Sequence, residues 1–135
     1  MAFQLSVDVR NATLSAIETE VGANPKLTVS SGTIPSDCAG ANTGTVLATL
    51  TLPSDWLGAP GLGSIQLSGT WQDLSADSSG TASYFRLFDN AGTTCHMQGT
   101  ITATGAGGDM QLDNTNIAAG QQINITAFTI TAGGA

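Results

Sequence analysis

Strict alternation of apolar and polar side chains is the feature that most restricts what this chain can fold into. The clearest example is Ser64–Trp71, in which every second residue is apolar or glycine and the residues between are polar. This pattern is typical of a half-buried strand, because successive side chains on a strand point to opposite faces. The buried face predicted for it consists of Ile65, Leu67, Gly69 and Trp71.

Similar segments, separated by turn residues, recur over residues 26–131. The expected strands are Lys26–Ser31, Thr45–Leu52, Ser64–Trp71, Thr81–Asp89, Thr93–Thr102, Met110–Leu112 and Gln121–Thr131, with a turn region over Asp113–Gly120. Short strands at such spacings, without alternating helices, favour two packed layers of sheet. We therefore expect an all-β fold, a β-sandwich or jelly roll of about seven or eight strands.

Two local features specify how these strands pair. The turn Asp89–Gly92 lies between two strand segments, and its glycine can adopt the left-handed conformation of a type I turn with a bulge. An antiparallel hairpin is therefore predicted here. In the last strand, Ile123 and Ile125 share one face whereas Phe128 and Ile130 share the other. A bulge near residues 126–127 would let both pairs face the core.

One helix is expected, from Ser6 to Val21. Leu14, Ile17 and Val21 recur at helical spacing, Ser6 can cap the first turn, and Gly22 can end the last one. The 135 residues form a single domain, 1–135, with a helical segment at 1–22 and strands over 26–131. A chain of this size buries roughly two thirds of its surface on folding, which is enough for one core.

The charge composition excludes several classes of partner. Charged residues make up 10% of the chain, and three cationic side chains against ten acidic ones give a net charge of −7. Phosphate recognition needs several cations on one face, so neither nucleic acid nor an anionic membrane is an expected partner. The first residues lack the basic and apolar regions of a secretory signal, so we expect synthesis in a cytoplasm. Cys38 and Cys95 are then expected to be free thiols.

No catalytic or metal-binding group emerges from the residue pattern. The lone histidine, His96, follows Cys95 directly, and adjacent strand residues point to opposite faces, so the two should not form a nucleophile–base pair. The run Gly107–Asn114 resembles a calcium-binding repeat but occurs once, and such repeats must stack to complete a site. We expect no enzyme activity, no metal and no cofactor.

The irregular loop Pro53–Gly63 is the one candidate contact region. It carries Trp56, Leu57, Pro60 and Leu62, which form the candidate protein interface. Apolar residues on a loop suit a protein interface or a sugar platform, but the pattern favours a loop that folds back over its own core. Trp71, by contrast, lies on the apolar face of its strand and is expected in the core.

Several segments together resemble a known class of protein. They are Arg10-Asn11-Ala12 in the leading helix, Leu27–Ser31 with Gly32 and Pro35 after it, Gly44–Leu50, Gly80–Asp89, and Gly108–Asn114 leading to Ile123–Thr131. In these features the chain resembles the small virion structural proteins of tailed bacteriophages, and among them the capsid decoration, or cement, proteins. The resemblance spans most of the chain and rests on structural motifs.

The resemblance implies a compact β-sandwich or jelly roll that needs neither catalytic residues nor a cofactor. It implies the major capsid protein as partner, together with copies of the same chain in a dimer or trimer. We expect the protein on the outer capsid surface, after synthesis in the host cytoplasm, because packaged phosphates would repel a charge of −7.

Two other functions remain open. The first is a carbohydrate- or receptor-binding β module of a tail or head fibre, in which Trp56, Tyr84 or Trp71 would stack on a sugar. The second is an assembly factor that is absent from the mature particle.

Overall fold

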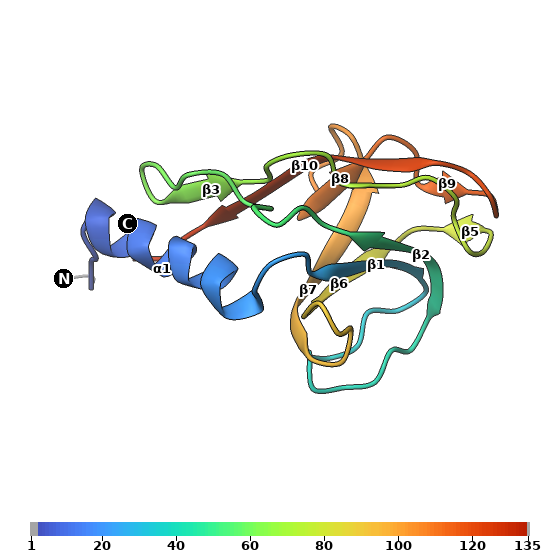
Figure 1. Cartoon of the computed structure of the whole chain (residues 1–135), viewed down its shortest axis with the longest axis horizontal. Coiled ribbons are helices and arrows are strands. Elements are labelled where there is room, and N and C mark those ends of the chain that lie inside the picture. The colour runs from blue at the N-terminus through green and yellow to red at the C-terminus, as the bar shows by residue number, and fades with distance from the viewer. Residues whose placement is uncertain (1–2, 135) are drawn as a thin grey trace.

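The computed structural model describes residues 3–134, so the first two residues and the last residue of the predicted domain lie outside it (Figure 1). Within these described residues, one helix precedes ten strands. The elements are α1 (Val7–Val21), β1 (Lys26–Ser31), β2 (Thr45–Thr51), β3 (Ser64–Gln66), β4 (Gln72–Asp73), β5 (Gly80–Thr81), β6 (Tyr84–Phe88), β7 (Cys95–Ala103), β8 (Met110–Leu112), β9 (Asn116–Ile117) and β10 (Ile123–Thr131).

The helix α1 begins and ends where the sequence predicts. The Ser6 hydroxyl accepts a hydrogen bond from the Val9 N–H at 3.2 Å, which satisfies one of the free donors of the first turn. Gly22 follows the last turn with a φ of 91°, a conformation that side chains disfavour. Leu14 and Val21 lie on the buried face of the helix, which therefore packs against the sheet by a narrow apolar stripe.

Eight strands form one continuous sheet in the order β2-β1-β6-β7-β8-β10-β3, with β4 also paired to β10. The strands β5 and β9 form a separate two-stranded sheet. The all-β character with one helix is thus confirmed. An arrangement of two facing sheets is not confirmed, because the hydrogen-bonded ladder is unbroken from β2 to β3, and the number of strands exceeds seven or eight.

The extra strands arise where a predicted strand is interrupted. The strand expected over residues 64–71 ends as β3 at Gln66, because Gly69 adopts a φ of 75° and lies exposed. Trp71 is nevertheless buried, as predicted, and β4 follows it. Similarly, two strands replace the one expected over residues 81–89: β5, which begins one residue earlier at Gly80, and β6, which ends at Phe88. The expected turn region over 113–120 contains β9, the partner of β5.

Both local pairing predictions are confirmed. The strands β6 and β7 form an antiparallel hairpin, and the Asp89 carboxylate accepts a hydrogen bond from the Thr93 N–H at 2.9 Å across its turn. The register of β10 against β8 shifts between Ile125 and Ala127, which is the expected bulge. As a result Ile125 and Phe128 are both buried.

The core is a single cluster of buried side chains that come from the helix, the sheet and the loop before β3. A chain of aromatic rings runs through it. The ring centroids of Trp56 and Trp71 are 6.0 Å apart, those of Trp71 and Phe128 are 5.7 Å apart, and Phe85 meets Phe128 edge-on at 5.6 Å. These contacts join the loop, β10 and β6. The sheet curls so that side chains from β6 and from β10 pack in the same core.

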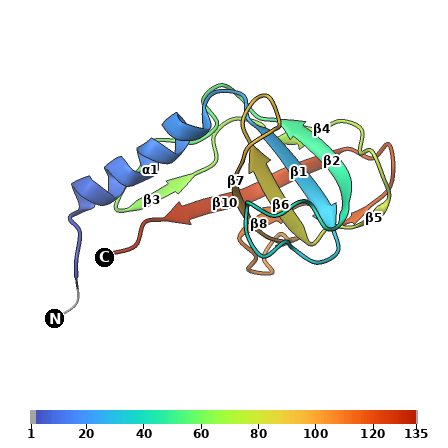
Figure 2. The same ribbon diagram turned by 90° about the horizontal axis from the view of Figure 1, so that it is seen from below.

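Figures 1 and 2 show that α1 extends away from the main body alongside β3 and the end of β10. The two ends of the described chain lie close together there, and the Leu5 N–H donates a hydrogen bond to the Gly134 carbonyl at 2.7 Å. The molecule is therefore elongated, with α1, β3 and both chain ends at one extremity.

Candidate functional site

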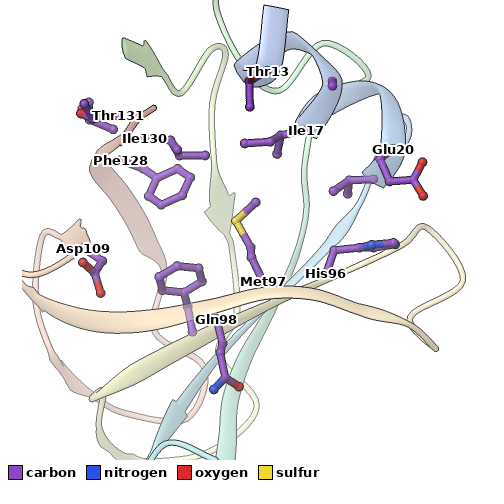
Figure 3. A pocket seen from close by; sticks show the side chains of 14 residues that line it. Thr13, Ile17, Glu20, His96, Met97, Gln98, Asp109, Phe128, Ile130 and Thr131 are labelled. Atoms are coloured by element: carbon purple, nitrogen blue, oxygen red, sulfur yellow. The ribbon is translucent and has the colours of Figure 1, made fainter. Parts of the chain in front are cut away.

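A groove of about 670 Å³ lies between α1, β7 and β10 (Figure 3). Its apolar lining comes from α1 through Ile17 and Val21, from β7 through Met97, and from β10 through Phe128 and Ile130. In Figure 3, Glu20 and His96 lie toward one end, and Asp109 and Thr131 lie toward the other. The groove is thus an apolar channel with polar ends.

The groove exists because β8 is short. The strand β8 lies between β7 and β10 only at residues 110–112, where it pairs with both. Beyond Met110 the two flanking strands continue without a strand between them, among the residues that the structure describes. At this point the Asp109 carboxylate accepts hydrogen bonds from the Thr100 N–H at 2.9 Å and hydroxyl at 3.0 Å. Asp109 therefore caps the free edge of β7, so its carboxylate already has a structural role.

The ionisable side chains Glu20, His96 and Asp109 are divided between the two ends of the groove. Over residues 3–134, no carboxylate, hydroxyl or thiol is hydrogen-bonded to the His96 ring, and no three His, Cys, Asp or Glu side chains are grouped as metal ligands. General acid–base catalysis needs a positioned partner within hydrogen-bond reach. The lining suits contact with an apolar group.

Two of the four predicted interface residues belong to the core. Trp56 and Leu57 are 0% and 1% exposed. The Trp56 indole N–H donates to the Gly22 carbonyl at 3.0 Å, and the Leu57 N–H donates to the Glu18 carboxylate at 2.8 Å. Both residues therefore bind the loop 53–63 to the C-terminal end of α1. Their burial corrects the expectation that they contact a partner. The loop folds back over the core at this point.

The other two residues, Pro60 and Leu62, lie nearer the surface. Pro60 is half-buried, and Leu62 is 84% exposed at the tip of the hairpin before β3. The turn is closed by hydrogen bonds of 2.9 and 3.0 Å between Gly61 and Ser64. Both of its central residues have positive φ, 54° at Leu62 and 77° at Gly63, as in a type I′ turn.

Leucine is a costly choice at this position. A residue with a Cβ in the left-handed region costs roughly 1–2 kcal/mol, and Asn, Asp or Gly normally occupies the site. Because its side chain is largely exposed, Leu62 recovers little of this cost by burial. The protein therefore holds a large apolar side chain out in solvent on a strained backbone.

Further exposed apolar side chains lie at the same extremity. The Gly63 N–H donates to the Asn11 side chain at 2.9 Å, and the Ala132 N–H donates to the Gly63 carbonyl at 2.9 Å, so the turn sits against α1 and the end of β10. Phe3 is 82% exposed and Val7 is 37% exposed just before and within the first turn of α1. We call Phe3, Val7 and Leu62 the apolar end.

A second structured feature is loop 32–44, which covers the face of the sheet opposite the core. The Arg86 side chain, 3% exposed, donates from Nη2 to the carbonyls of Cys38 at 2.9 Å and Gly40 at 2.8 Å. The Gln98 amide donates to the Pro35 carbonyl at 2.7 Å. These bonds hold the loop against β6 and β7.

The two cysteines meet beneath this loop. Both are free thiols, and their Sγ atoms are 2.8 Å apart. Burial first, and then the hydrogen bond with Cys95, together raise the pKa of the Cys38 thiol to about 11.

Sequence reasoning identified the loop that carries Leu62 but missed Phe3, Val7 and the groove. The pattern Gly-Leu-Gly between two strand segments was the available signal, because a hairpin turn with leucine at its tip must expose that leucine. For the groove no local signal exists, since it depends on how far β8 extends between two distant strands.

No protein-family model, curated protein or solved structure matches the chain. None of the helical structure within residues 3–134 is both long and apolar enough to cross a bilayer.

Proposed function

We propose that the protein is a non-catalytic virion structural protein of the capsid decoration type, which binds the outer surface of the major capsid shell and stabilises it. The observation that carries this proposal is Leu62, a largely exposed leucine in a left-handed backbone conformation. We infer that Leu62, which lowers the stability of the isolated chain and is largely exposed, serves in a contact with another molecule.

The apolar end has the character of an attachment site. Phe3 and Val7 belong to the N-terminal segment and the first turn of α1, and the Gly63–Asn11 hydrogen bond holds the turn that carries Leu62 against the same helix. A large apolar side chain inserted into a pocket of a partner is the usual anchor of a protein interface. One such contact is weak, but a dimer or trimer repeated over a symmetric shell gains avidity.

The net charge of the chain and the packing of its sheet around one core agree with this role. A net charge of −7 suits the outside of a shell better than the side that faces packaged phosphate. We infer that the curled sheet, whose halves enclose one aromatic core, is the sandwich-like body that decoration proteins present.

The burial of the aromatic side chains weighs against a sugar-binding module. Trp56, Trp71 and Tyr84 would have to be exposed to stack on a sugar ring, and all three are buried. The receptor-binding alternative would therefore have to use other residues, which the experiment below can reveal.

The test uses phage particles that lack this protein. Purified wild-type protein should co-sediment with them and raise the temperature at which they release DNA. The variant Leu62→Asn should bind at least tenfold more weakly. Leu74→Asn is the matched control, because Leu74 is also exposed, at 67%, but lies outside the apolar end. It should bind like wild type.

Three results would overturn the proposal. Equal binding by Leu62→Asn and wild type would show that the apolar end is not the attachment site. Particles that retain DNA equally well without the protein, yet fail to adsorb to host cells, would favour the receptor-binding module. Absence of the protein from purified wild-type particles would favour an assembly factor.

A further inference from the structure

The two cysteines are brought together from distant parts of the chain. Cys38 lies in loop 32–44, and Cys95 is the first residue of β7, 57 residues later. Their sulfur atoms are 2.8 Å apart and both residues are half-buried. A disulfide has an S–S bond of about 2.05 Å, so a small side-chain movement is enough to form one.

A bulge in β7 produces this proximity. In the β6–β7 ladder Leu87 pairs with Met97, but Phe88 pairs with Cys95, so His96 is the extra residue. Without the bulge Cys95 would share the core-facing side with Met97, two residues along. The bulge instead places Cys95 opposite Phe88, on the face that loop 32–44 covers.

The loop side of the pair is equally well fixed. The hydrogen bond from Arg86 to the Cys38 carbonyl, at 2.9 Å, holds the backbone that carries the thiol. The Gln98–Pro35 hydrogen bond, at 2.7 Å, anchors the loop a few residues earlier. Formation of a disulfide therefore requires no rearrangement of either segment, which lowers its entropic cost.

We propose that Cys38 and Cys95 form a reversible disulfide that locks loop 32–44 onto the sheet once the protein meets oxidising surroundings. Both are thiols in a reducing cytoplasm and close when the protein leaves it. This inference rests on the geometry of the two thiols and is independent of the proposed attachment site.

The oxidant is a low-molecular-weight disulfide such as oxidised glutathione. One cysteine loses its proton, and its thiolate attacks the external disulfide, forming a mixed disulfide and releasing one glutathione thiolate. The second cysteine then loses its proton and attacks the mixed disulfide, which releases the second thiolate. The two protons end on the two released thiols, so two protein thiols are oxidised and one external disulfide is reduced.

The environment of Cys38 controls when this happens. Because burial and the hydrogen bond with Cys95 raise the pKa of Cys38 to about 11, little of its thiolate is present at neutral pH. Oxidation should therefore be slow near pH 7 and faster as the pH rises toward 11.

The test exposes reduced full-length protein to oxidised glutathione at pH 8. Wild type should lose two hydrogens in its intact mass, stay monomeric on a non-reducing gel, and resist alkylation after denaturation. Its melting temperature should rise by about 10 °C, because the cross-link closes a long loop of the unfolded chain. Adding a phosphine reductant should reverse all of these changes.

The variants Cys38→Ser and Cys95→Ser serve as controls. Each can only form the mixed disulfide, so each should gain one glutathione and show no rise in melting temperature. The proposal is overturned if both wild-type thiols remain open to alkylation after oxidation, if the product is a disulfide-linked dimer, or if oxidation leaves the wild-type melting temperature unchanged. The wild-type measurements alone decide the outcome if a serine variant does not fold.

Discussion

Leu62→Asn should stabilise the isolated protein while it weakens attachment to the capsid. At this position the φ of 54° places the residue in the left-handed region. Leucine pays roughly 1–2 kcal/mol for that conformation, whereas asparagine adopts it readily because its short polar side chain can bond locally. The substitution keeps the turn and changes the side chain at its tip.

The loss of apolar contact is smaller than this gain. Full burial of a leucine side chain contributes about 1.5–3 kcal/mol, and Leu62 is 84% exposed, so its remaining contacts contribute at most about 0.5 kcal/mol. The net expected effect is an increase of about 1 kcal/mol in the free energy of unfolding. For a domain of this size that corresponds to a rise of about 3–5 °C in melting temperature.

Thermal unfolding followed by circular dichroism, with reduced protein throughout, measures this shift. Leu74→Asn is again the control and should leave the melting temperature within about 1 °C of wild type, because surface substitutions away from special backbone positions change stability little. A melting temperature of Leu62→Asn at or below that of wild type would refute the reasoning. It would mean that the leucine side chain stabilises the folded monomer by more than its backbone conformation costs.

Three further substitutions test other parts of the structure. Arg86→Met should lower the free energy of unfolding in urea by about 2–4 kcal/mol, because two loop carbonyls lose a charged donor. Gly44→Ala would place a Cβ 1.7 Å from the Ser31 carbonyl oxygen, so loop 32–44 should detach and become the first site of limited proteolysis. The backbone N–H of Thr93 lowers the pKa of Asp89, so the stability that this carboxylate contributes is present at neutral pH and is lost as the pH falls below about 4. Asp89→Asn should therefore melt below wild type at pH 7, and the difference in melting temperature should shrink as the pH falls and the Asp89 carboxylate is protonated.

The parts of the fold that the sequence predicts correctly are those with local causes. The limits of α1 depend on Ser6 and Gly22, which act on backbone groups within one turn. The hairpin depends on the turn over residues 89–92, and the bulge of β10 follows from the parity of its own apolar residues. Each of these signals acts over a few residues.

The parts that sequence reasoning did not predict depend on distant contacts. The strand β8 pairs in parallel with β7, and this single ladder turns two expected layers into one continuous sheet. Trp56 is buried because its indole meets a carbonyl that lies 34 residues earlier. For the same reason the loop pattern could not distinguish the buried Trp56 from the exposed Leu62.

The position of β10 in the chain has a consequence for biosynthesis. This strand pairs with β3, β4 and β8, and its Phe128 contacts both Trp71 and Phe85. Until residues 123–131 have left the ribosome, β3 and β4 lack their strand partner, β8 has only β7 beside it, and the apolar residues that β10 covers are open to solvent. The nascent chain can form α1 and the β6–β7 hairpin early, but its sheet closes only after β10 is released. Completion of the sheet therefore has to wait for β10, and the incomplete chain is exposed to chaperones and proteases until then.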